Sequence, residues 1–155
     1  MRKFPHRGSG SLHGGVAGVL RELPVMETDQ STESTLYERI GGGQTFERLA
    51  HDFYVRVAAD QRLRALYPEE DLAGAEERLR LFLEQYWGGP REYSATRGHP
   101  RLRIRHAPYA ITPQLRDVWV QHMLAALDTL DVEDPDRAVM RDYFERAATF
   151  MINAG

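Results

Sequence analysis

The chain has 155 residues and a formal net charge of −3; 42% of its residues are hydrophobic and 28% are charged, which is the composition of one globular domain. The small acidic excess argues against general attraction to nucleic acid or membranes, and no apolar run approaches the roughly 20 residues needed to cross a bilayer. Cysteine is absent, which excludes thiol catalysis, thiolate metal ligands and disulfides, and we expect a soluble, cytoplasmic protein.

The first 34 residues contain many glycines, two prolines and little apolar periodicity. The apolar run from Val16 to Leu20 is too short and too glycine-broken to form the core of a signal peptide. We therefore predict a flexible tail over residues 1–34 and one folded domain over residues 35–155.

Helical spacing begins at Leu36 and predicts three helices before residue 68. The first covers Thr35 to Ile40 and ends at three consecutive glycines, and the third is capped by Asp60 and ends at Tyr67-Pro68. The second helix between them has one apolar face, formed by Phe46, Leu49, Ala50, Phe53 and Val57.

Three longer helices follow. Asp71 is the expected N-cap of the fourth, Thr112 caps the fifth with Pro113 at its first position, and Asp134-Pro135 repeats this arrangement for the sixth. The predicted apolar faces are Leu72, Ala75, Leu79, Phe82, Leu83 and Tyr86 in the fourth helix, Leu115, Trp119, His122, Met123, Ala126 and Leu130 in the fifth, and Val139, Tyr143, Ala147, Phe150 and Met151 in the sixth.

About two dozen residues between Gly88 and Thr112 show no clear periodicity, and long irregular loops in a folded domain are usually functional. The stretch from Arg101 to Arg105 alternates as a strand would, but the chain offers no second strand to pair with it. The predicted fold class is therefore all-α.

His99 and His106 lie in this loop, whereas the other four histidines fall in the predicted tail or on helix faces, namely His6, His13, His51 and His122. Neither loop histidine has the histidine or glutamate partner at helical spacing that a zinc site needs, whereas a heme iron needs only one axial imidazole. A lone histidine in a loop also serves structure alone, and the spacing leaves both readings open.

Three polar aromatic residues lie on or beside apolar positions: Tyr54, Tyr67 and Trp119. A buried phenol or indole needs a hydrogen-bond partner. The three donors either converge on one ligand or each bond separately to a backbone carbonyl, and their spacing does not decide between these arrangements.

Several motifs in order give the chain a strong family resemblance over Leu36 to about Asn153. These motifs are Tyr37, Gly42-Gly43, Thr45-Phe46, Phe53-Tyr54, Tyr67-Pro68, Phe82-Leu83, Tyr86-Trp87-Gly88-Gly89-Pro90, Gly98-His99-Pro100, Arg105-His106-Ala107-Pro108 and Trp119. In this order they resemble the group II truncated hemoglobins, the hemoglobin O type of actinobacteria.

This resemblance implies a two-over-two helical sandwich around heme b. The arginine-rich segment from Gly98 to Pro108, called the basic loop below, then replaces a full proximal helix. It implies His106 as the proximal iron ligand and Tyr54, Tyr67 and Trp119 as distal donors. Ala75 then stands at the distal gate, where many globins have histidine or glutamine. Leu79 and Phe82 are expected on the distal ring face, and Tyr86 near the heme edge.

Heme carries two anionic propionates, so its slot needs cations at the mouth. Arg105 is the first candidate for this contact, followed by Arg103 and Arg78, and the alternative for each is a solvated surface charge.

The function expected from these features is tight binding of oxygen and other small ligands (carbon monoxide, nitric oxide, sulfide, peroxide). Nitric oxide dioxygenation and peroxide reduction are candidate reactions. Expected partners are small diatomic and anionic ligands and a reductase; a homodimer is compatible with the sequence, and nucleic acid and membrane insertion are not expected. The alternatives are a gas or redox sensor and, from another class, a helical module that binds nucleic acid or phosphate through the arginine loop.

Overall fold

The structure is a computed structural model that describes residues 33–68 and 70–155. The predicted tail lies outside these residues except for its last two positions. Contacts divide the chain after Ser34, and all the helices below belong to the unit Thr35–Gly155. Within the described residues, no helix is both long enough and apolar enough to span a bilayer.

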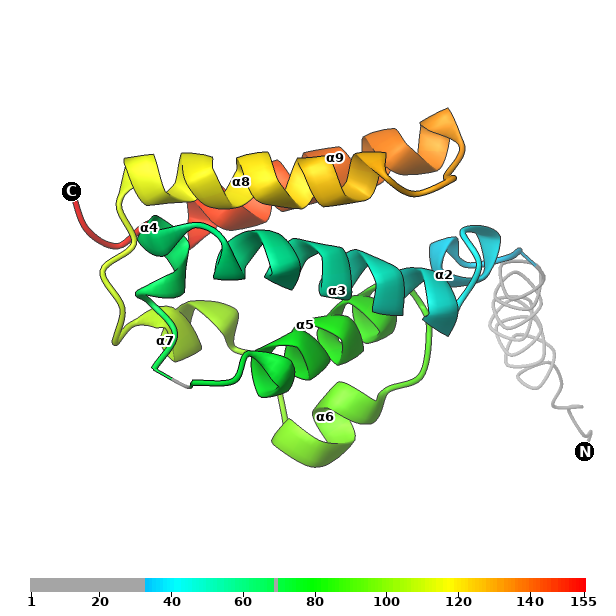
Figure 1. The fold of residues 1–155 in the computed structure, drawn as a ribbon. Coiled ribbons are helices and arrows are strands. Elements are labelled where there is room, and N and C mark those ends of the chain that lie inside the picture. Colours follow the sequence, from blue (N-terminus) through cyan, green and yellow to red (C-terminus); the bar gives the residue numbers. More distant parts are fainter. Residues whose placement is uncertain (1–32, 69) are drawn as a thin grey trace, which may run out of the picture. The chain divides into compact units, whose positions relative to one another are not determined.

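The described residues form eight helices and no strand, so the predicted all-α class is confirmed (Figure 1). The helices are α2 (Leu36–Arg39), α3 (Gly43–Ala58), α4 (Gln61–Arg64), α5 (Ala73–Tyr86), α6 (Glu92–Arg97), α7 (Leu102–His106), α8 (Pro113–Asp128) and α9 (Asp134–Phe150).

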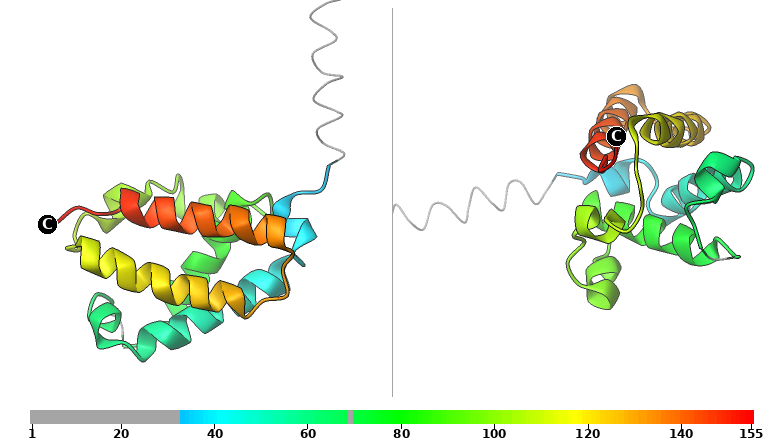
Figure 2. Two further views of the ribbon diagram at one scale, coloured as in Figure 1. Left: turned by 90° about the horizontal axis from the view of Figure 1, so that it is seen from above. Right: turned by 90° about the vertical axis from the view of Figure 1, so that its left-hand side faces the viewer.

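Two antiparallel pairs of long helices make up the fold. Helices α3 and α5 pack against each other, as do α8 and α9, and contact between α3 and α8 joins the two pairs. Helices α8 and α9 lie side by side in the views of Figures 1 and 2, and α3 and α5 form the other pair. This arrangement is the predicted two-over-two sandwich.

The core lies where α3 meets its neighbours. The five apolar residues predicted on the face of the second helix are all fully buried in α3: Phe46, Leu49, Ala50, Phe53 and Val57. Helix α8 contributes Met123 and Ala126, which are also fully buried. Burial of this face stabilises α3 far more than its local propensity does.

Two predicted caps, at Asp60 and Thr112, are present, and Thr35, at the predicted start of the first helix, is a cap that was not predicted. The Thr35 hydroxyl accepts from the backbone N–H of Glu38 in a full capping box, the Asp60 carboxylate accepts from Arg62, and the Thr112 hydroxyl accepts from Leu115. These bonds satisfy backbone donors that have no partner inside the helix. They place the starts of α2, α4 and α8 within a residue of their predicted positions.

Two predicted caps were wrong. Helix α5 begins at Ala73 with Leu72 at the N-cap, although the Asp71 carboxylate still accepts from the Ala73 N–H at 2.8 Å. Helix α9 begins at Asp134 itself, and Glu133 at its N-cap makes no side-chain capping bond. An acidic residue near the first turn favours a helix start through the helix dipole without being the cap. The presence of Asp71 and Asp134 therefore indicated where these helices start but not which residue is the N-cap.

The apolar face predicted for the sixth helix was also wrong, because the buried residues follow the predicted ones by one position. Met140, Phe144 and Ala148 are the buried residues of α9, whereas Val139 and Phe150 are 50% and 61% exposed. The ring of Phe144 packs edge-on against Trp87 and Trp119, with centroids 5.6 and 6.1 Å away. The aromatic partners on other helices therefore decided which face of α9 turns inward.

Residues 88–112 contain α6 and α7 rather than one irregular loop, and the alternating segment is helical. Both helices are too short to show periodicity, and tertiary bonds support them. The side-chain Nε2 of Gln85 donates to the Ser94 hydroxyl at 2.7 Å, and the Ser94 backbone N–H donates back to the side-chain Oε1 of Gln85 at 2.9 Å. These bonds join α6 to α5.

The turn after α5 requires glycine at position 89. The Gly89 N–H donates to the Glu84 carbonyl at 2.7 Å, and the Tyr37 N–H donates to the Trp87 carbonyl at 3.0 Å. A Cβ on Gly89 would lie 2.6 Å from the Tyr37 ring and 2.9 Å from the Glu84 carbonyl oxygen. The turn therefore leaves no room for a side chain.

We predict that Gly89→Ala lowers the free energy of unfolding by about 1–3 kcal/mol, the usual cost of overpacking. Gly74→Ala is the matched control, because its Cβ would meet only the flexible end of Arg78 at 3.1 Å. Since alanine favours a helix over glycine, this control should be neutral or gain up to about 1 kcal/mol. Urea unfolding measures both, and equal losses in the two variants would contradict the steric explanation.

Candidate functional site

His106 ends α7, with its ring half-buried. Its Nδ1 lies 2.7 Å from the carbonyl oxygen of Leu102. A carbonyl only accepts, so Nδ1 carries the hydrogen and the Nε2 of the neutral ring keeps its lone pair. In the described part of the chain Nε2 has no hydrogen-bond partner. This arrangement suits a metal ligand, whose second ring nitrogen is commonly held by a carbonyl.

Arg105 organises the segment before His106. Its Nε donates to the Pro100 carbonyl and its Nη2 to the Arg97 carbonyl, both at 2.7 Å, and its guanidinium lies 5.8 Å from the centroid of the Tyr93 ring. Two of its three nitrogens thus bond within the chain. A contact to a propionate stays a prediction, and Nη1 is the nitrogen that can make it without breaking these bonds.

Arg103 and Arg78, the other two propionate candidates, differ in their surroundings. The Arg103 Nη1 donates to the Phe150 carbonyl at 2.5 Å, and its guanidinium lies over the Phe150 ring at 5.5 Å. Arg103 therefore ties α7 to the end of α9. Arg78 is half-buried on α5. Contact of Arg103 or Arg78 with a propionate stays a prediction.

Asn153 holds the chain just after the predicted ligand and was not predicted from the sequence. Its Nδ2 donates to the Tyr109 carbonyl at 2.9 Å and the His106 carbonyl at 3.3 Å, while its Oδ1 accepts from the Ile111 N–H at 2.8 Å. A single asparagine near the C-terminus carries no pattern that would have identified it.

Tyr54 and Tyr67 come together as the sequence suggested they could. Their hydroxyl oxygens are 3.5 Å apart and their rings meet edge-on with centroids 5.7 Å apart. Tyr54 is 7% exposed on α3, whereas Tyr67 is half-buried after α4. A hollow of about 430 Å³ reaches Tyr54 from the surface between α3 and the start of α5.

Trp119 lies on α8 and is linked to this pair through Phe53. The Phe53 centroid is 5.0 Å from that of Tyr54 and 5.3 Å from that of Trp119. The Trp119 indole N–H has no hydrogen-bond partner among the described residues. A half-buried donor without a protein partner fits a place beside a ligand.

The apolar residues expected against the cofactor lie on α5. Ala75 is 3% exposed, and Leu79 and Phe82 are half-buried against the core. Tyr86 is 52% exposed, and its ring packs on Tyr143 of α9 with centroids 4.2 Å apart. Burial, together with the neighbouring Tyr86, raises the pKa of Tyr143 to about 12. The contact with α9 was not predicted for Tyr86.

Asp60 joins the start of α4 to α8, a link that the sequence analysis missed. His122 Nε2 lies 2.8 Å from Asp60 Oδ2, and Arg62 donates to the same carboxylate through Nη2 at 2.7 Å and Nε at 3.0 Å. The hydrogen bonds that the Asp60 carboxylate accepts, first from Arg62 and second from His122 in importance, hold the pKa of Asp60 well below its usual range. Asp60 was predicted only as a cap.

Comparison with known proteins identifies the family. A family model described as bacterial-like globin matches residues 35–153. The group 2 truncated hemoglobin YjbI of Bacillus subtilis is 37% identical over 117 residues, which cover 76% of this chain and 87% of that protein.

Two solved structures show the same relationship. The hemoglobin of Chloroflexus aurantiacus is 57% identical with a TM-score of 0.76, covering 78% of this chain and 99% of that chain. The truncated oxygen-avid haemoglobin from Bacillus subtilis is 36% identical with a TM-score of 0.73, covering 77% and 100%.

The chain belongs to the bacterial-like globins and, among them, to the group II truncated hemoglobins. It is therefore a heme-based, oxygen-binding globin.

The described residues fit a heme. Across residues 33–68 and 70–155, no three histidine, aspartate or glutamate side chains gather that could hold a metal ion by themselves. A heme iron needs one axial imidazole from the protein, and His106 offers an uncommitted Nε2. The half-buried Leu79 and Phe82 provide apolar surface for a porphyrin ring.

The low pKa of Asp60 predicts a pH-dependent contribution to stability. Its carboxylate is stabilised in the folded state relative to an ordinary aspartate, whose pKa is about 3.9. The contribution is thus complete above about pH 4 and is lost as the pH falls towards the folded-state pKa. Asp60→Asn should lower the melting temperature at pH 7, and the gap from wild type should shrink below about pH 4.

Thermal unfolding monitored by circular dichroism across pH 2–7 measures this. Asp117→Asn is the control, because that exposed carboxylate pairs only with the neighbouring Arg116 on its own helix. A gap between wild type and Asp60→Asn that stayed constant down to pH 2 would contradict the ionic origin of the effect.

Proposed function

We propose that this globin holds heme b through His106 and binds oxygen tightly, with Tyr54, Tyr67 and Trp119 as donors to the ligand. The close approach of the Tyr54 and Tyr67 hydroxyls, at 3.5 Å, is the observation that carries this proposal. The phenol of Tyr54 on α3 and that of Tyr67, which follows α4, meet in a largely buried place, and the Trp119 ring lies one aromatic ring away. Family membership supplies the heme-based class.

His106 is suited to holding the iron for an electronic and a geometric reason. The Leu102 carbonyl accepts from Nδ1, which orients the ring and leaves the lone pair of Nε2 for the iron. The bonds of Arg105 and Asn153 fix the backbone on both sides of His106. The heme, when bound, supplies an iron centre for a small neutral or anionic ligand.

Tyr54, Tyr67 and Trp119 stabilise a ligand that carries partial negative charge. Each can donate one hydrogen bond, and bonds to charged groups contribute roughly 1.5 to 3 kcal/mol, or about 10- to 150-fold in a dissociation rate. A hydroxyl can also accept, so one tyrosine can orient the other. Several converging donors should therefore make oxygen leave slowly.

Slow release suits retention or chemical turnover better than transport. The related structure from Bacillus subtilis is described as oxygen-avid. We extend the proposal to redox turnover, such as nitric oxide dioxygenation or peroxide reduction, for which a reductase is the expected partner. Sulfide, carbon monoxide and nitric oxide are further ligands of the same site.

We predict that His106→Ala abolishes retention of heme by the purified protein. The Soret absorbance per protein after size-exclusion chromatography measures this retention. His99→Ala is the matched control, since His99 is an exposed histidine three residues before α7. Retained heme in His106→Ala together with heme loss in His99→Ala would reverse the assignment of the ligand.

We predict that the three donors act as a network, so that their effects on oxygen dissociation are not additive. Single changes of Tyr54, Tyr67 or Trp119 to phenylalanine should speed dissociation modestly, because the remaining donors reorient. Trp119→Phe should have the largest single effect, since an indole only donates. The triple variant should release oxygen far faster than any single one.

Stopped-flow dissociation across all seven combinations tests this, with carbon monoxide as the less polar control. Rate logarithms that simply add would contradict the network. Equal acceleration for carbon monoxide would instead indicate steric gating.

A further inference from the structure

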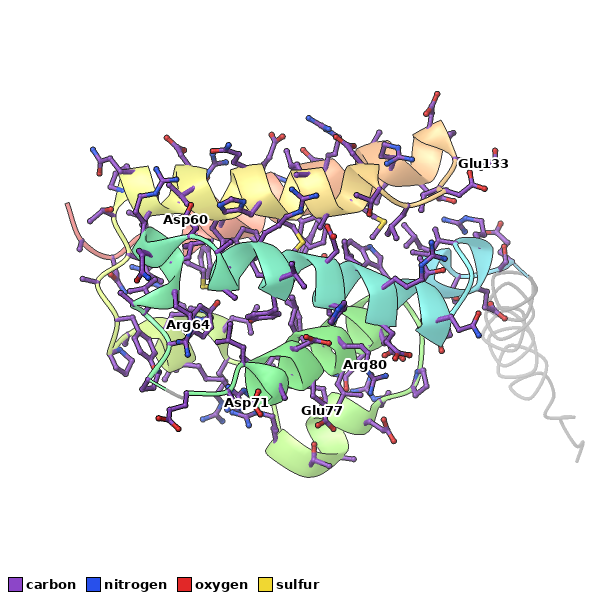
Figure 3. All side chains as sticks on the ribbon, in the orientation of Figure 1. Asp60, Arg64, Asp71, Glu77, Arg80 and Glu133 are labelled. Carbon is purple, nitrogen blue, oxygen red and sulfur yellow. The ribbon has the colours of Figure 1, made fainter. Side chains whose placement is uncertain are left out.

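The described residues contain one hydrogen bond between the start of α4 and α8 that involves a histidine. His122 Nε2 lies 2.8 Å from Asp60 Oδ2, and both side chains are mostly buried, at 17% and 13% exposed. Asp60 lies where α4 meets α8, as Figure 3 shows. Such a partly buried bond between two elements is screened less than a surface ion pair.

Backbone bonds connect Asp60 to Tyr67 through Arg64. The Arg64 N–H donates to the Asp60 carbonyl at 2.8 Å, and the Tyr67 N–H donates to the Arg64 carbonyl at 3.1 Å. The Arg64 guanidinium then donates to the Tyr67 carbonyl at 3.0 Å and to the Glu70 carbonyl at 2.9 Å. These bonds tie the position of the Tyr67 backbone to that of Asp60.

The other end of the bond is on the helix that carries Trp119. His122 follows Trp119 by three residues on α8, so both lie on neighbouring positions of one helix face. The His122–Asp60 bond thus joins the segment of one distal donor to the helix of another. The side chain of Leu63, 1% exposed, also anchors α4, but by apolar packing, which is less directional than a hydrogen bond.

We propose that His122 is a positioning residue for the distal site, which holds Tyr67 in register with Tyr54 and Trp119 through Asp60. This inference rests on the proposed function, since it takes the Tyr67 hydroxyl as a donor to the ligand. In this proposal His122 acts through its bond to Asp60 and not through contact with the ligand. It acts by restricting where the segment between residues 60 and 67 can lie against α8.

Arg62 provides a matched control within the same cluster. It bonds to the same carboxylate as His122, but its guanidinium is 64% exposed and joins Asp60 only to its own helix. Arg62→Gln removes a partner of Asp60 and keeps the link between α4 and α8. His122→Leu removes the link. His122→Gln places an amide donor near the position of the imidazole Nε2 and should restore the link between α4 and α8.

The test measures oxygen dissociation from the ferrous holoprotein by stopped flow. His122→Leu should speed dissociation by at least about twofold, which corresponds to the lower end of the interaction energies found between residues in contact. His122→Gln and Arg62→Gln should keep dissociation rates near that of wild type. In a Tyr67→Phe background the effect of His122→Leu should vanish, because the hydroxyl it positions is gone. Equal effects of His122→Leu in both backgrounds would overturn the proposal.

Hydrogen exchange of the holoprotein gives a readout independent of ligand kinetics. Amides of residues 63–67 should exchange faster in His122→Leu than in Arg62→Gln, and amides in α9 should not change. Unchanged exchange in that segment would overturn the positioning role. If Tyr67→Phe alone leaves dissociation unchanged, the proposed donor role fails; if Tyr67→Phe speeds it and His122→Leu does not, only the inference about His122 fails.

Discussion

The hydrogen bond from His106 Nδ1 to the Leu102 carbonyl is the interaction on which the candidate site depends. It exists only because residues 102–106 form one helical turn, which brings the carbonyl of one residue to the side chain four positions later. The bond selects which ring nitrogen keeps a lone pair. An extended segment would orient the ring differently and leave Nδ1 without this partner.

Arginine side chains turn the basic loop into a scaffold. Arg105 and Arg103 direct guanidinium nitrogens to backbone carbonyls of residues 97, 100 and 150, so much of their bonding capacity is used inside the chain. These contacts weaken the alternative in which the loop serves as a nucleic-acid surface, since phosphate binding needs accessible guanidinium groups. The same bonds keep α7 in place with few apolar contacts of its own.

The two tyrosines proposed as distal donors come from elements that are distant in the chain. Tyr54 comes from the long, buried α3, which sets its position firmly, whereas Tyr67 follows a single-turn helix that needs external support. That support comes from Asp60, Arg64 and, across the fold, His122. The two side chains meet at their hydroxyls, 3.5 Å apart.

The sequence alone was enough to predict the all-α class, the buried face of α3 and the caps at Asp60 and Thr112, because long helices and local caps depend on neighbours a few positions apart. Its ordered motifs were enough to indicate the family. The sequence did not predict α6 and α7, the inward face of α9 or the bonds of Asn153 and His122. Those depend on partners 9 to 62 positions away, and only packing of the whole chain brings these side chains together.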